Sequence, residues 1–153
     1  LSQEVSMTLN DLTVNFSHLN RDSLLSDWEW LLEGKFLPIL MSASGDAFVQ
    51  HVENREVWWL DTGGAEFSKV AESPEQFNEL LSDKEFVVEC FAIQMVGDLI
   101  QSGKVLSNGQ IYSLIQPWLL GGEYKISNIN PTDIEVHFSL SGQIAKQVGR
   151  SES

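Results

Sequence analysis

The side chains that most often carry chemistry are few in this sequence and stand apart from one another. The three histidines, His18, His51 and His137, form no H-x-x-x-H or H-E-x-x-H pattern, and none has a cysteine at zinc spacing. His51 and Asp61 could approach each other across neighbouring strands, although surface or hydrogen-bonded histidines are the simpler interpretation. The sequence therefore predicts no metal site and no cofactor.

Nucleophilic catalysis has equally little support. Cys90 is the one cysteine, so no disulfide can form within the chain. Its neighbours Phe86, Val87 and Phe91 predict a buried, inert thiol rather than the polar setting that a Cys–His pair needs. The sequence contains no G-x-S-x-G elbow, phosphate-binding loop or dinucleotide fingerprint. We therefore predict that this chain is not an enzyme.

Carboxylates are plentiful, so any single pair carries little information. A glycosidase needs two acids that face a cleft, one of them in an apolar pocket, and no pair is marked in that way. The enzymatic alternative is an uncharacterised hydrolase that uses carboxylates or His137, with Asp133 and Glu135 nearby. A concave pocket holding these side chains is the feature that would keep this alternative open.

The charge balance restricts the partners. The chain has 22 acidic and 9 basic residues, a formal net charge of -13 and a pI near 4.4. Nucleic acids and anionic membranes are disfavoured because affinity for them comes from Lys and Arg. A basic protein would be attracted, and the alternative is that the acidity serves only solubility. We expect a cytoplasmic protein, since the start lacks a secretory signal and no apolar run is long enough for a membrane helix.

Tryptophan supplies the candidates for a binding surface. Trp58 and Trp59 are adjacent in a predicted strand, so their side chains must point to opposite faces of the sheet. One face should be core. A helix covering the other face would make the pair structural, which we favour, whereas an exposed Trp beside acidic residues would anchor a protein partner. Trp118 poses the same question in a loop. The predicted partner-binding residues are Trp58, Trp59, Asp61, Trp118, Glu123 and Tyr124.

The length of 153 residues suits one domain, which we place at residues 21–150. Residues 1–20 are expected to form an arm or a short helix, and residues 151–153 a disordered tail. Helical spacing is expected from Asp22 or Ser23 to Gly34. Strands are expected at residues 36–43, 47–51, 56–61 and 66–70. Their loops are too short for parallel crossovers, so they predict an antiparallel meander.

The second half alternates helices and strands. Ser73 and Pro74 predict a helix that ends near Leu81, and Ser82 or Asp83 begins another that runs to about Ser102. Strands are expected at residues 110–115 and 123–128. Residues 133–138 favour a strand, with a helix as the alternative, and residues 139–148 a helix. The fold class is therefore α+β, a meander sheet with packed helices.

Several motifs in order resemble a bacterial domain family long labelled as of unknown function. They are Leu25-Ser26-Asp27-Trp28-Glu29-Trp30-Leu31, Pro38-Ile39-Leu40, Ser44-Gly45-Asp46-Ala47-Phe48, Val57-Trp58-Trp59-Leu60-Asp61-Thr62, Val70-Ala71-Glu72-Ser73 with Phe77, Gly109-Gln110-x-Tyr112, Pro117, Leu120-Gly121-Gly122-Glu123-Tyr124, Asn128, Val136-His137-Phe138-Ser139 and Gly142-Gln143-Ile144. The family is similar to the C-terminal domain of immunity proteins that neutralise DNase effectors of type VI secretion. More distantly it resembles the SUKH superfamily of Smi/Knr-like proteins.

The resemblance implies a non-enzymatic module that binds and neutralises a toxin, in this case a basic, nuclease-like one. Those immunity proteins carry a further N-terminal domain, and residues 1–20 are too short to form one. A regulatory or scaffold domain of the same SUKH-like fold with another partner is therefore the alternative. Gly121, Gly122 and Gln143 are expected to be fixed by turn geometry and buried hydrogen bonding.

Overall fold

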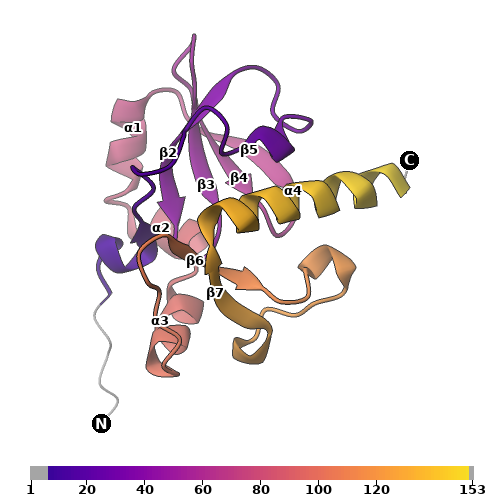
Figure 1. Cartoon of the computed structure of the whole chain (residues 1–153). Coiled ribbons are helices and arrows are strands. Elements are labelled where there is room, and N and C mark those ends of the chain that lie inside the picture. The colour runs from indigo at the N-terminus through magenta and orange to yellow at the C-terminus, as the bar shows by residue number, and fades with distance from the viewer. Residues whose placement is uncertain (1–6, 152–153) are drawn as a thin grey trace.

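The computed structural model describes residues 7–151 and shows a five-stranded antiparallel meander, in the order β1-β2-β3-β4-β5 (Figure 1). The strands are β1 (Thr13–Val14), β2 (Phe36–Ser42), β3 (Ala47–His51), β4 (Val57–Asp61) and β5 (Glu66–Ala71). The expected α+β meander is confirmed. Residues 1–6 of the expected arm and residues 152–153 of the expected tail lie outside the described residues.

The sheet separates two hydrophobic clusters, because neighbouring side chains along a strand point to opposite faces. Phe48 and Trp59 pack in one cluster with α1 (Pro74–Leu80), α2 (Lys84–Phe91) and α3 (Ile93–Gln101). Trp58 packs in the other with α4 (Ile134–Ser151) and η2, a short 3-10 helix (Ser26–Trp28). The sheet is thus the middle of three layers, with α4 crossing in front of it in Figure 1.

The first two helices begin where the capping residues predict. The Ser73 hydroxyl accepts a hydrogen bond from the Gln76 N–H, and the Asp83 carboxylate accepts one from the Glu85 N–H. The single helix expected to run to Ser102 is wrong, because the chain breaks at Ala92 into α2 and α3. Ala92 has φ +49°, a left-handed conformation that ends one helix and redirects the next.

The helix expected from residue 22 to Gly34 is also wrong. This segment consists of turns around η2, in which Trp28 N–H bonds to Leu25 C=O and Leu31 N–H to Trp28 C=O. Leu24, Leu25 and Trp28 are nevertheless buried. The apolar spacing therefore marked the buried side correctly, but successive turns satisfy that spacing as well as an α-helix does.

A second sheet closes the end of the molecule. It is a hairpin of β6 (Gln110–Leu114) and β7 (Ile129–Asp133), separated by the 3-10 helices η3 (Trp118–Leu120) and η4 (Ile126–Asn128). The strand expected at residues 123–128 is wrong, because that segment is irregular and ends in η4. The Tyr112 N–H donates to the Ala43 carbonyl, so β6 joins the main sheet where β2 ends.

The strand expected at residues 133–138 is wrong as well, and the alternative, a helix, holds. Asp133 ends β7, and its carboxylate accepts a hydrogen bond from the Val136 N–H at the start of α4. Ile134 and Phe138 are fully buried and lie four residues apart, whereas Val136 is exposed. The apolar pattern that suggested period two was therefore the first turn of a helix.

We predict that Gly142→Ala destabilises the domain, because α4 crosses η2 at this residue. A Cβ atom there would lie 2.6 Å from the Asp27 carbonyl oxygen, so the helix or the turn must move. The expected loss is about 2 kcal/mol in the free energy of unfolding, measured by urea denaturation. Gly149→Ala on the same helix meets nothing within 4 Å and should be neutral or slightly stabilising. Equal effects of the two substitutions would contradict the close contact.

Candidate functional site

One cavity lies where the β2–β3 turn and the β4–β5 turn of the sheet meet the hairpin, α2 and α4. Its volume is about 230 Å³. The sheet contributes Ser44, Asp46, Trp59, Asp61, Thr62 and Gly63, α2 and the start of α3 contribute Glu89, Cys90, Ala92 and Met95, and the remaining wall is Tyr112, Ser113, Leu114, Pro117, Trp118, Leu119, Tyr124, His137, Ser141 and Ile144. The cavity therefore draws on every layer of the fold.

His137 forms the floor and joins three segments. Its Nε2 lies 2.8 Å from the Gly45 carbonyl oxygen and 3.2 Å from the Thr62 hydroxyl, and its Nδ1 lies 2.7 Å from the Ser113 hydroxyl. A carbonyl only accepts, so Nε2 carries the proton and donates to Gly45, while Nδ1 accepts from Ser113. Burial lowers the pKa of His137 to about 4, so the ring is neutral at pH 7.

Asp46 is the second unusual group. Its Oδ1 accepts hydrogen bonds from the Thr62 N–H at 3.0 Å and the Thr62 hydroxyl at 3.2 Å. Burial, and then the charge of Asp61, raise the pKa of the Asp46 carboxyl to about 8 despite these bonds. Two acids therefore share one end of the cavity, and at pH 7 Asp46 holds a proton.

The Ser113–His137 contact is better explained as structural than as catalytic. A general base works best with a pKa near the working pH, and a pKa near 4 makes His137 a weak proton acceptor. Asp133 and Glu135, the other residues of the hydrolase hypothesis, are exposed and do not line the cavity. His137 does lie in a concave pocket, so geometry alone keeps that alternative open.

The loop from Gln116 to Asn128 forms the outer wall, and Asn128 fixes its shape. The Asn128 amide N–H groups donate to the Gln116 and Glu123 carbonyls, and its Oδ1 accepts from the Gln116 N–H at 2.9 Å. Gly122 is required because a Cβ atom there would lie 1.8 Å from the Gln116 carbonyl oxygen. Gly121, at φ +92°, ends η3 in a left-handed conformation.

This rigid loop presents aromatic side chains at the cavity. Trp118 and Tyr124 are 52% and 53% exposed, and Leu120 beside them is 52% exposed. The Tyr124 hydroxyl nevertheless points inward against Gly63, where a Cβ atom would collide with it. Burial and the charges of Asp61 and Asp46 raise the pKa of Tyr124 to about 12, so its hydroxyl keeps its proton.

Four of the six predicted partner-binding residues line this cavity, namely Trp59, Asp61, Trp118 and Tyr124. Trp58 lies on the opposite face of the sheet, stacked on Phe67 with ring centroids 4.8 Å apart. Glu123 is exposed and pairs with Lys125 at 3.2 Å. Trp58 therefore packs on the face of the sheet away from the cavity, and the partner-binding role of all six residues stays a prediction.

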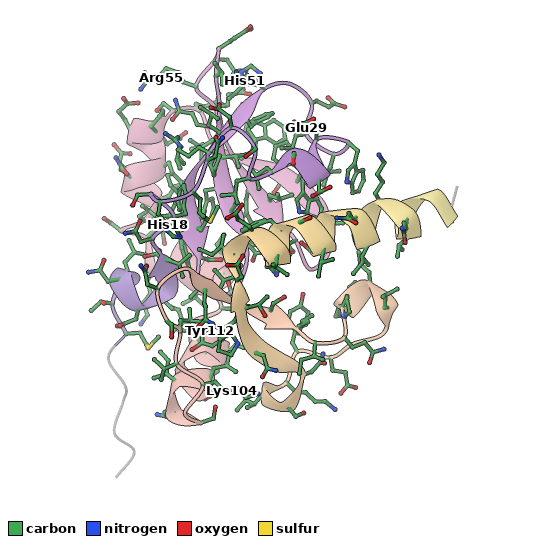
Figure 2. The ribbon with its side chains drawn as sticks, in the orientation of Figure 1. His18, Glu29, His51, Arg55, Lys104 and Tyr112 are labelled. Atoms are coloured by element: carbon green, nitrogen blue, oxygen red, sulfur yellow. The ribbon has the colours of Figure 1, made fainter. Side chains whose placement is uncertain are left out.

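The predicted approach of His51 to Asp61 is wrong, because the antiparallel register places them at opposite ends of their strands. Asp61 lies beside the β2–β3 turn, whereas His51 accepts hydrogen bonds from Glu53 and Asn54 at the β3–β4 turn. Figure 2 shows His51 and Arg55 together at that end of the sheet, and His18 lies elsewhere. Among residues 7–151, no group of three His, Cys, Asp or Glu side chains could hold a metal ion.

Two further expectations concern single side chains. Cys90 is buried, and burial, followed by Glu89, Asp46 and Asp61, raises the pKa of its thiol to about 12. A thiol with this pKa is unreactive, as the sequence predicted. Gln143 differs from expectation, since it is exposed and donates a hydrogen bond to Ser139 on the same helix.

Within the described residues no helix is long and apolar enough to cross a membrane.

The segment that builds the hairpin, the rigid loop and the start of α4 also identifies the family. Residues 71–145 match the family model described as T6SS immunity protein Tdi1, C-terminal. This segment belongs to the Tdi1 C-terminal family. The resemblance seen in the sequence is thereby confirmed for these residues, whereas the earlier motifs, up to Val70, lie before the matched region. Comparison with curated proteins gives no match.

The Tdi1 C-terminal segment contains several motifs whose geometry is tightly constrained. Gly121, Gly122 and Asn128 shape the aromatic loop, His137 anchors α4, and Gly142 allows α4 to cross η2. Sequence reasoning missed the roles of Asp46, Thr62 and Ser113. Asp46 and Thr62 stood in quoted motifs, but a turn was a sufficient explanation for them until the register placed both beside His137.

We predict an unusual dependence of stability on pH. An acid whose pKa rises from its ordinary value of 3.8 to about 8 on folding makes the folded state less stable as pH rises between these values. His137 has the opposite effect, because its pKa falls from 6.5 to about 4 on folding. The folded state therefore becomes less stable as the pH falls below 6.5. Above pH 6.5 the effect of Asp46 is therefore unopposed by His137.

The test is urea denaturation of Asp46→Asn and of the unchanged chain at pH 6.5 and 8. The amide keeps an Oδ1 acceptor for Thr62 but has no proton to lose in this range. The unchanged chain should lose at least about 1 kcal/mol more than the variant between the two pH values. Parallel losses would show that Asp46 does not titrate there.

Proposed function

We propose that this chain is an immunity protein that binds a basic, nuclease-like toxin and neutralises it without catalysis. Membership of residues 71–145 in the Tdi1 C-terminal family carries this proposal, because the family is one of type VI secretion immunity proteins. Such proteins imply a cognate toxin as partner. The particular toxin is inferred from charge, since a chain of net charge -13 attracts and steers a basic protein.

The face around the cavity is the surface best suited to such a partner. It combines exposed aromatic side chains, Trp118 and Tyr124, with the acids Asp61, Glu89 and Glu123. Aromatic residues dominate the energy of protein interfaces, and rim charges govern association rates. Asn128 and Gly122 hold the loop in one shape, so little conformational entropy is lost when a partner binds it.

A regulatory or scaffold role with another partner is the second candidate. The same face would serve that role, and the distant resemblance to the SUKH superfamily is compatible with it. The two functions differ in whether the partner is harmful without this chain. Genetic context also separates them, because an immunity gene is expected beside the gene of the effector that it neutralises.

Protection from the neighbouring effector is the direct test. The chain and the effector encoded beside it are expressed together in a susceptible bacterium, with an empty vector and a catalytically inactive effector as controls. We expect the chain to restore colony counts to those of the inactive effector. We also expect the purified pair to associate more slowly as salt rises, because charges screened beyond about 10 Å no longer steer. A toxic effector that still kills in the presence of the folded chain would overturn the immunity role.

A further inference from the structure

The cavity has an imbalance of charge that the rest of the molecule does not correct. Asp46, Asp61 and Glu89 line it, and the described lining residues include no lysine or arginine. The ion pairs among the described residues join Arg55 to Glu75, Lys69 to Glu56 and Glu72, and Lys125 in the neighbouring loop to Glu123, so none of them involves Asp46, Asp61 or Glu89. Lys104 donates to the carbonyls of Ile126 and Ile129. The acids are therefore left to an outside cation.

The pKa of Asp46 is raised first by burial and then by the neighbouring charge of Asp61. Burial and the Asp61 charge keep a proton on Asp46, although Thr62 offers it two hydrogen bonds that favour the ionised form. Only Oδ1 accepts those bonds, and Oδ2 accepts none from the described residues. A positive charge beside the two carboxyl groups would offset both causes, so the proton would leave and the bound cation would meet a charged pair.

The walls suit a cation that is attached to an apolar stem. Trp118 and Tyr124 line the cavity and are about half exposed, and guanidinium groups bind over the faces of such rings. Leu114, Leu119 and Met95 supply an apolar wall for a chain of methylene groups. The Trp59 indole also lines the cavity, and its N–H is buried with no hydrogen-bond partner among the described residues, so its NMR signal reports on what enters the cavity.

The volume of the cavity favours a single side chain of a protein partner over a free metabolite as the ligand. Its 230 Å³ is below the range of about 300–1,000 Å³ that is usual for small-molecule sites. A single long side chain needs less space, and the protein that carries it can cover the exposed rim. We propose that the cavity receives an arginine side chain of the toxin, whose guanidinium lies between Asp46 and Asp61 and stacks on Trp118.

This inference rests on the proposed function, so two separate measurements are needed. The first uses the chain alone. N-acetyl-arginine methylamide is titrated while the indole N–H signals are followed by NMR, with N-acetyl-citrulline methylamide as the uncharged analogue of the same shape. We expect the arginine compound to shift the Trp59 signal and the citrulline compound to bind at least about tenfold more weakly. Equal shifts by both, or no shift up to the solubility limit, would overturn the proposal.

The second measurement uses the inactive effector encoded beside the chain. Asp61→Asn keeps the acceptor for the Gly64 N–H, so the turn should remain intact, and Glu79→Gln on α1 is the control with the same change of charge. We expect Asp61→Asn and Trp118→Leu to weaken effector binding by about 30-fold or more, and the control by less than about threefold.

The outcomes distinguish the two proposals. An unchanged chain that does not bind the effector contradicts the immunity role, while the arginine titration still decides what the cavity accepts. Effector binding that survives both cavity substitutions overturns only the docking of an arginine. Binding of the free arginine compound together with unchanged effector affinity would show that the cavity serves a free cationic molecule, and would likewise reject the docking.

Discussion

The buried imidazole of His137 is the interaction on which the arrangement of this domain depends. Its two nitrogens connect α4 to the β2–β3 turn at Gly45, to the β4–β5 turn at Thr62 and to β6 at Ser113. The Gly45 carbonyl and the Thr62 hydroxyl also bond to each other at 2.7 Å, whereas the ring nitrogens and the Ser113 hydroxyl would be poorly satisfied without this meeting, which is costly in the interior. Because the three segments meet at one ring, the cavity beside it has a defined shape without a ligand, and the aromatic loop is held at its edge.

The same site contains several acidic groups whose charged forms are disfavoured by burial and by one another. Asp46 and Asp61 lie close together in surroundings that penalise charge, and neighbouring thiol and phenol groups have raised pKa values for the same reason. Such an arrangement contributes little to folding. It is physically reasonable in a protein that meets a basic partner, because part of the stability lost in the free chain returns as binding energy when a cation arrives. Under the proposed function, the acidic composition and the cavity have one explanation.

The sequence predicted the sheet well because its signals are local. Turn residues and alternating side chains set the strands of the meander, and Ser73 and Asp83 set the starts of two helices. It failed where one apolar pattern fits two structures, as in the turns around Trp28 and the first turn of α4. Ala92 gave no signal, since nothing in its type requires a left-handed conformation. Only part of the site could be predicted from the sequence. Exposed aromatic residues can be proposed from composition, whereas the contact between Asp46, Thr62 and His137 depends on the register of the strands.

Hydrogen–deuterium exchange of the chain with and without its bound effector shows whether the cavity face is the binding face. We expect slower exchange in the loop from residue 116 to 128 and in the β4–β5 turn at residues 61–65. We expect no change at the β3–β4 turn near His51 and Arg55, which lies at the other end of the sheet. Protection confined to that turn or to α1, with the aromatic loop exchanging as in the free chain, would contradict the account.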